Sequence, residues 1–109
     1  MSSFAQTPKP PYYAVIFTSV LNSGDNGYHA MAEKMLELAA TMPGYLGVES
    51  AREEIGLTVS YWESEEAIAQ WKAHSLHQLA QEKGKAEWYA KFQVRVAKVE
   101  RDYDFTSGH

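Results

Sequence analysis

The spacing of apolar side chains divides the chain into short strands and amphipathic helices. Residues 12 to 21 are rich in aromatic and β-branched side chains, and both alternating sets are apolar, which is typical of a strand covered on both faces. A turn cluster follows at residues 22 to 27. Apolar residues then recur at helical spacing and predict a first helix, with a stripe formed by Tyr28, Met31, Ala32, Met35, Ala39 and Met42.

Turn residues mark the next boundaries. Pro43-Gly44 ends the first helix, and residues 45 to 52 read as a second strand. A turn at residues 53 to 56 leads to a third strand, residues 57 to 61, so the pattern predicts a hairpin. Ser64 is a good N-cap for a second helix beginning near Glu65. That helix buries Ile68, Trp71 and Leu79, and Gly84 is the expected break before a final strand at residues 92 to 103.

The predicted order is β-α-β-β-α-β. With right-handed crossovers, this order gives an α+β, ferredoxin-like fold in which two main helices cover one face of a four-stranded antiparallel sheet. Several strands carry apolar residues on both sides, so the uncovered face would expose a large apolar patch. We therefore expect a homodimer that pairs the open sheet faces. Residues 1–11 are expected to form a flexible arm, residues 12–105 the domain and residues 106–109 a tail.

Composition narrows the classes of function. The 109 residues include no Cys, which excludes disulfides, thiolate metal sites and cysteine nucleophiles and favours a cytoplasmic location. A net charge of −4 with scattered basic residues argues against nucleic acid as a partner. No apolar run is long enough for a membrane helix, so we expect a soluble protein with no membrane partner. The seven Tyr and three Trp suit a flat organic ligand or a subunit contact.

Candidate chemistry gathers on the second helix. His74 and His77 lie three residues apart on one helical face, but no nearby Cys, Asp or Glu at helical spacing completes a metal set. We therefore interpret both as surface or hydrogen-bonded histidines and not as metal ligands. The alternative functional interpretation is that His77 acts as a proton shuttle. Trp71 is balanced between core and pocket, and Trp62 is structural first and a pocket wall second. Met35 belongs to a stripe that either fills the core or contacts a ligand.

Two further expectations concern the last strand. Arg95 alternates away from Phe92, Val94 and Val96, and if it is buried it requires a carboxylate, for which Glu49 is the candidate. Trp88 and Tyr89, just before that strand, are expected at a subunit edge. The chain carries no Gly-rich phosphate loop or nucleotide fingerprint, so flavin and nicotinamide cofactors are unsupported.

Three segments carry a family resemblance, namely residues 43 to 50 (PGYLGVES), residues 61 to 64 (YWES), and Ala67-Ile68 with Trp71. They resemble the antibiotic-biosynthesis monooxygenase domain family, in which a P-G-[FY] step ends the first helix and a W-x-S corner precedes a helical Trp. The resemblance spans residues 12 to 105. It implies a dimeric α+β barrel with a pocket in each subunit between the sheet and its helices.

The resemblance implies two kinds of activity. Some relatives are cofactor-independent monooxygenases in which an aromatic, polyphenolic or quinol substrate itself reduces O2. For that chemistry an apolar cage, hydrogen-bond donors and a proton shuttle suffice. Here Trp62 and Trp71 would be cage walls, Tyr61 or Tyr45 hydroxyl donors, Thr58 or Ser60 polar contacts, and His74 or His77 the acid-base group.

Other relatives degrade haem and bind its iron through a His ten residues beyond the helical Trp. That position is Gln81 in this chain, and an amide is a poor iron ligand beside imidazole. Haem is therefore the minority expectation, and no cofactor is the favoured one. A non-catalytic dimeric module that binds a small apolar ligand is the third alternative.

Overall fold

The structure, a computed structural model, describes residues 4–22, 28–81 and 88–108, except for the side chains of residues 76–81. Its elements are β1 (Tyr12–Leu21), α1 (Tyr28–Ala40), β2 (Tyr45–Arg52), β3 (Gly56–Trp62), α2 (Glu65–Gln81) and β4 (Tyr89–Val99). This confirms the predicted β-α-β-β-α-β order. The last strand begins and ends earlier than predicted, and the break expected at Gly84 lies outside the described residues. No helix in the described ranges is long and apolar enough to cross a membrane.

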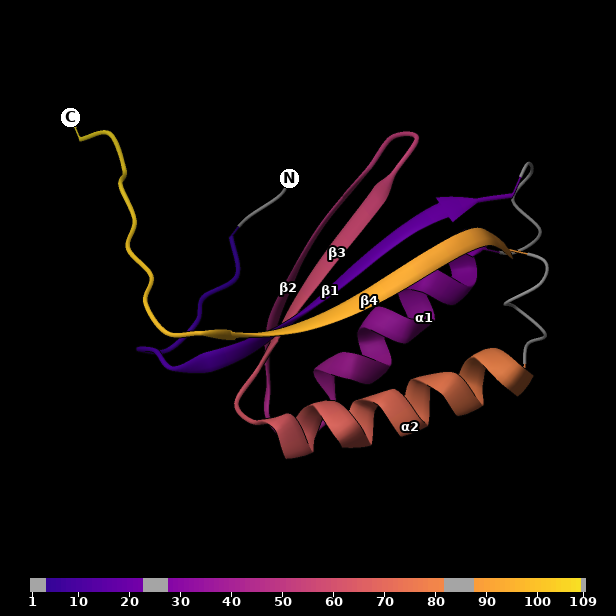
Figure 1. Cartoon of the computed structure of the whole chain (residues 1–109), viewed down its shortest axis with the longest axis horizontal. Coiled ribbons are helices and arrows are strands. Elements are labelled where there is room, and N and C mark those ends of the chain that lie inside the picture. Colours follow the sequence, from indigo (N-terminus) through magenta and orange to yellow (C-terminus); the bar gives the residue numbers. More distant parts are fainter. Residues whose placement is uncertain (1–3, 23–27, 82–87, 109) are drawn as a thin grey trace.

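The four strands form one antiparallel sheet in the order β2-β3-β1-β4, as the ferredoxin-like prediction requires. Both helices lie on the same side of it (Figure 1). We call this side the inner face. It carries Val15 and Phe17 of β1 opposite Ser60 and Thr58 of β3. The alternate residues form the outer face, where Ile16 lies opposite Val59.

Two corners of the chain meet at one end of the sheet. Gly44, at the turn from α1 to β2, has φ +86°, and a Cβ there would lie 2.6 Å from the Cβ of Ala67 on α2. The carbonyl of Gly44 accepts a 2.8 Å hydrogen bond from the backbone N–H of Glu63. Ser64 caps α2, because its Oγ accepts the Ala67 N–H at 3.1 Å. The three segments that carry the family resemblance therefore meet at this end of the sheet.

Trp62 fills the space beneath these corners. Its side chain is 0% exposed, and its Nε1–H donates to Ser60 Oγ at 2.9 Å. It packs with Ala39, Ala67 and Ile68 to form the first cluster of the core. A second cluster lies apart from it and centres on Met31 and Trp88, with Tyr28, Met35 and Tyr89 packed around them. The expectation that Trp88 packs at a subunit edge was wrong, because α1 of its own chain already covers it.

The outer face contains polar contacts that the sequence did not predict. Glu49 accepts hydrogen bonds from the Tyr61 hydroxyl and from the Ala5 backbone N–H, both at 2.9 Å. The expected Arg95–Glu49 ion pair was wrong, because β2 and β4 are opposite edges of the sheet. Arg95 is exposed and donates to Gln93 at 2.9 Å, so it needs no buried carboxylate.

The chain termini lie against the same outer face. Ala5 is so close to Gly47 that a Cβ on the glycine would be 2.8 Å from the alanine Cβ. The Tyr12 hydroxyl donates to Asp102, which follows β4, and receives a 3.1 Å hydrogen bond from Thr7. Residues 4–8 thus cover the outer face near β2 and leave Ile16 and Val59 only half-buried.

We expect Trp62→Ala to lower the free energy of unfolding by about 3 to 5 kcal/mol, because it empties the first cluster and removes the donor to Ser60. Urea denaturation measures the loss. Tyr103→Ala is the matched control, since that aromatic ring is 93% exposed, and we expect its effect to stay within about 0.5 kcal/mol. Equal effects of the two substitutions would contradict this view of the core.

Stability should fall at high pH partly through Tyr61. Burial, with a smaller contribution from the hydrogen bond to Glu49, raises the pKa of Tyr61 to about 12. The unfolded chain releases this proton near pH 10. The unfolded state therefore binds fewer protons between these pH values, so stability declines as pH rises through this window. We expect urea midpoints of Tyr61→Phe to decline less from about pH 9 to about pH 11 than those of wild type or Tyr103→Phe. Parallel declines would refute the assignment.

Candidate functional site

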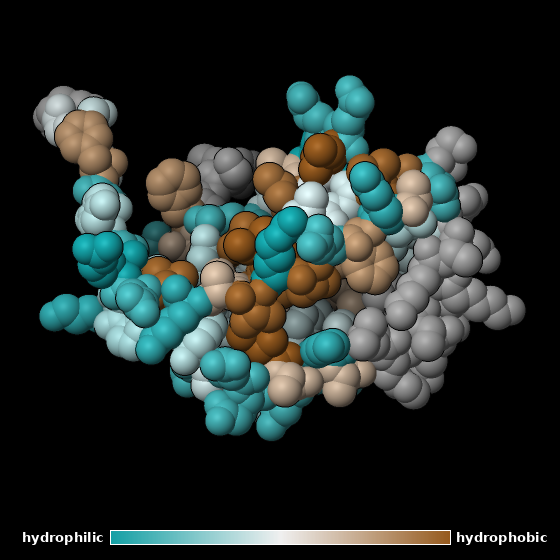
Figure 2. Space-filling model, in the orientation of Figure 1, coloured by the Kyte–Doolittle hydropathy of each residue, from teal (hydrophilic) through white to brown (hydrophobic). Residues whose placement is uncertain are grey.

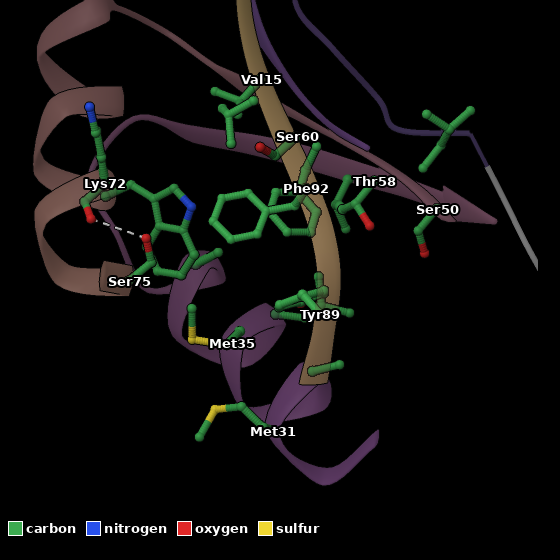
Figure 3. A pocket seen from close by; sticks show the side chains of 18 of the residues that line it. Val15, Met31, Met35, Ser50, Thr58, Ser60, Lys72, Ser75, Tyr89 and Phe92 are labelled. Atoms are coloured by element: carbon green, nitrogen blue, oxygen red, sulfur yellow. Dashed lines mark hydrogen bonds between the residues drawn. The ribbon is translucent and has the colours of Figure 1, made fainter. Parts of the chain in front are cut away.

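A cavity of about 670 Å³ lies between the helices and the inner face of the sheet. It lies between the two core clusters, because its lining includes Ala39 and Ile68 of the first and Met31 and Trp88 of the second. Figure 3 shows side chains from both helices and from the sheet around this space, among them Met31 and Met35 on α1, Lys72 and Ser75 on α2, Val15 on β1, Ser50 on β2, Ser60 and Thr58 on β3, and Tyr89 and Phe92 on β4. The volume is within the usual range for small-molecule sites.

The floor of the cavity carries small hydroxyl side chains on one half, where they lie among apolar residues such as Val48 and Leu57, and it is mainly apolar on the other half. The half formed by β2 and β3 carries the hydroxyls of Ser50, Thr58 and Ser60. The half formed by β1 and β4 is apolar and carries Val15, Phe17, Phe92, Val94 and Val96. The strand register places these halves side by side, since Ser60 is opposite Val15 and Thr58 is opposite Phe17. A flat molecule that has oxygens along one edge matches such a floor.

Two irregularities of the strands turn tyrosines into the cavity. The β2–β3 register shifts between Tyr45 and Gly47, so Tyr45 shares the inner face with Val48 although the two are three residues apart. The β1–β4 register shifts between Val20 and Leu21, and Tyr89 then shares that face with Phe92. β-Bulges often redirect side chains in this way next to functional sites.

Both of these tyrosines keep their protons. Burial raises the pKa of Tyr45, and burial, together with the nearby Tyr28 hydroxyl, raises the pKa of Tyr89. Their hydroxyls are consequently neutral hydrogen-bond donors at physiological pH. Neutral phenols can stabilise an oxyanion that develops on a ligand without carrying a charge themselves.

A stack of rings leads from the core to the surface along α2. Trp62 stacks on Trp71 with 5.9 Å between the ring centres, and Trp71 stacks on His74 at 6.5 Å. Trp71 lines the cavity, whereas Trp62 lies behind it and the exposed His74 lies beyond it. His74 thus stacks on a residue of the cavity wall without lining the cavity itself. The side chain of His77 lies outside the described residues.

The structure brings together five of the predicted contact residues, because the cavity is lined by Trp71, Tyr45, Thr58, Ser60 and Met35. Tyr61 is not among them. It lies on the outer face, and its hydroxyl donates to Glu49, so a substrate contact within this cavity is ruled out by its position. The alternation of β3 contains the signal that sequence reasoning overlooked, since Tyr61 cannot share a face with Ser60 or Trp62.

The sequence analysis missed Arg52, the last residue of β2, which also lines the cavity. Its Nη2 donates to the buried Ser19 hydroxyl and lies 3.5 Å from the Tyr28 hydroxyl. Among the described residues that line the cavity, Arg52 and Lys72 are the only charged ones, and both are cations. Alternation with Val48 and Ser50 was the available signal, because it places Arg52 on the inner face.

The cavity opens along β4. The helices make their main contacts with β2 and β3, which leaves Phe92, Val94 and Val96 of β4 partly exposed. Figure 2 shows apolar surface gathered in this region, between β4 and α2, with hydrophilic side chains around it. Within the described residues no group of three or more His, Cys, Asp and Glu side chains could hold a metal ion. The chemistry on offer is therefore an aromatic cage with hydroxyl donors and two cations.

Comparisons with known proteins agree with this architecture. The uncharacterized protein YqjZ of Bacillus subtilis (strain 168) is 55% identical over 103 residues, which cover 93% of this chain and 90% of YqjZ. Among solved structures, SnoaB from Streptomyces nogalater, a cofactor-independent oxygenase in a mutant form, has a TM-score of 0.69 at 9% identity, covering 84% of this chain and 95% of SnoaB.

A heme-degrading protein from Mycobacterium tuberculosis has a TM-score of 0.54 at 20% identity, covering 88% of this chain and 100% of that protein. At these identities the two solved structures show a shared fold. A family model described as antibiotic biosynthesis monooxygenase matches residues 11–83. The chain belongs to the antibiotic biosynthesis monooxygenase family.

Proposed function

We propose that the protein is a cofactor-independent monooxygenase that oxidises a small aromatic, polyphenolic or quinol substrate in the cavity between sheet and helices. The observation that carries this proposal is the cavity itself, about 670 Å³, lined by aromatic and aliphatic side chains with a few hydroxyls. Such a lining excludes water from a flat substrate and leaves hydrogen bonds for its oxygens. Family membership supports the reaction class.

The reaction needs little chemistry from the protein. An electron-rich hydroquinone supplies the electrons that O2 requires. One oxygen atom enters the ring and the other leaves as water, so the hydroquinone becomes a hydroxyquinone without an external reductant. The protein holds the ring against Trp71, and the neutral hydroxyls of Tyr45 and Tyr89 donate to developing negative charge on oxygen. His74 and His77 on α2 are the candidate groups for proton transfer.

Haem is the alternative ligand for this fold. Among the described side chains, no imidazole lines the cavity, because His74 is exposed beyond Trp71 and His29 is exposed at the start of α1. The described donor set therefore does not fit haem iron, which is commonly held by His. His77 lies outside that set. We accordingly give the cofactor-independent reaction preference.

We expect purified protein to consume O2 with at least one member of a panel of substituted hydroquinones and dihydroxynaphthalenes, measured with an oxygen electrode. Trp71→Ala should lower kcat/KM by about tenfold or more, since ~1.4 kcal/mol of lost transition-state contact has this effect. Tyr103→Ala, a substitution of an exposed ring outside the cavity, should leave it unchanged.

A folded protein that consumes no O2 with any compound of the panel would refute the proposal. Addition of hemin to the same preparation tests the alternative. A Soret band that shifts on His77→Ala would favour haem, whereas the absence of a band would remove that reading.

We also propose a homodimer through the outer face of the sheet. Ile16 and Val59, which are directly paired across β1 and β3, remain half-buried there in the single chain. Apolar surface of this kind is commonly covered by a partner, and a chain of 109 residues gains stability from association.

Val59→Lys should convert the dimer into a monomer, because it places a charge at the centre of the paired faces. Light scattering after size exclusion measures the mass. Ile55→Lys is the matched control, since Ile55 lies in the exposed β2–β3 turn and its substitution should leave the mass unchanged. A wild-type mass of one chain at micromolar concentration would contradict the dimer.

A further inference from the structure

Arg52 is held at one end of the cavity by contacts that use only part of its guanidinium. Nη2 donates to Ser19 Oγ, and Ser19 is 1% exposed. The same nitrogen lies 3.5 Å from the Tyr28 hydroxyl, and the guanidinium carbon lies 5.6 Å from the centre of the Tyr28 ring. These contacts fix the plane of the cation, because arginine stacks on aromatic faces and its donors are rigidly arranged.

The backbone of β3 makes room for this arrangement. Gly56 is opposite Arg52 in the β2–β3 register. A Cβ at Gly56 would lie 2.1 Å from the guanidinium carbon and from Nη2 of Arg52. The guanidinium therefore lies over the backbone of β3 at Gly56, in space that a side chain at position 56 would occupy. Any larger residue at position 56 has to displace the end of a flexible side chain, which preserves the backbone while it moves the charge.

Within the part of the chain that the structure describes, the remaining donors of Arg52 are available to a ligand. A guanidinium has five N–H donors, and within the described part of the chain only Nη2 has a hydrogen-bond partner. No described carboxylate pairs with Arg52, and no acidic side chain is among the described residues that line the cavity. A partly buried cation without an anion is unusual, since such charges are normally paired. Among the described residues, the wall thus carries a positive charge that no carboxylate matches, in a chain whose net charge is −4.

We propose that Arg52 is a specificity-determining residue that binds the carboxylate of an aromatic acid, so that the substrates of the cavity are aromatic carboxylic acids. This proposal rests on the proposed function in one respect, namely that an aromatic molecule binds in the cavity. Arginine matches a carboxylate with two parallel hydrogen bonds, whereas a neutral hydroxyl uses only one. The acid group lies at the Arg52–Gly56 end, and the ring extends over the inner face toward Trp71. The end of β3 at Trp62 is about 20 Å from Gly56, which leaves room for a fused ring system.

Equilibrium binding of two matched probes tests this proposal without any turnover. The probes are 2-naphthoate and 2-naphthamide, which share shape and ring and differ in charge. We expect calorimetric titration of wild type to show binding of the acid about tenfold or more tighter than binding of the amide, because hydrogen bonds to charged groups exceed neutral ones by that margin. Arg52→Gln should abolish the preference while retaining an amide donor for Ser19.

Two further variants distinguish the effect of the position of the Arg52 guanidinium from the effect of overall charge. Gly56→Ala keeps every charge but pushes the guanidinium away, so the preference for the acid should fall as in Arg52→Gln. Arg95→Gln removes an exposed arginine on the outer face and should keep the full preference. Urea midpoints and circular dichroism confirm that each variant is folded.

Four results would overturn the proposal. These are equal affinity of wild type for both probes, absence of binding of the acid, an unchanged preference in Arg52→Gln, and loss of the preference in Arg95→Gln. Failure of the monooxygenase assay is a separate result. The charge preference is measured at equilibrium and stands whether or not O2 is consumed.

Discussion

The contact between the two chain corners, with Trp62 beneath it, determines how the helices sit on the sheet. Gly44 lies against Ala67 at a distance that admits no side chain, and the Gly44 carbonyl binds the Glu63 N–H. Both α1 and α2 are therefore anchored at the same end, directly over a tryptophan that is 0% exposed. This anchor fixes the end of α1 and the start of α2 on the sheet, and with them one end of the cavity that lies between the helices and the sheet.

The cavity exists because the core is divided. Ala39 and Met31 lie on the same helix, yet one belongs to the cluster around Trp62 and the other to the cluster around Trp88. α1 bridges the interval and is supported at both ends, so the space between the clusters stays open. A chain of 109 residues that leaves about 670 Å³ unfilled gives up close packing that would stabilise it. Such a volume is more readily understood as a place for a ligand.

Local sequence patterns predicted the helices and strands well. They could not predict the contacts that depend on strand order and register across the sheet. Alternation and the Ser64 cap identified β1, β2 and α2, because those signals depend on neighbouring residues. The Arg95–Glu49 pair failed because strand order is a property of the whole sheet. Tyr45 lines the cavity, and its side chain reaches it through a bulge that no propensity reveals. Alternation with Val48 and Ser50 could have placed Arg52 on the inner face, but the close approach of its guanidinium to Gly56 is a contact across the hairpin that local patterns do not reveal.

The divided core also couples recognition to folding. An apolar ligand that fills the cavity contacts both core clusters and connects them into one continuous hydrophobic core. Binding to the native chain alone then adds to stability by mass action, about 2.7 kcal/mol at a hundredfold excess over Kd. The melting temperature therefore rises when a ligand occupies the cavity. A thermal-shift screen of small molecules can identify such ligands before any reaction is known.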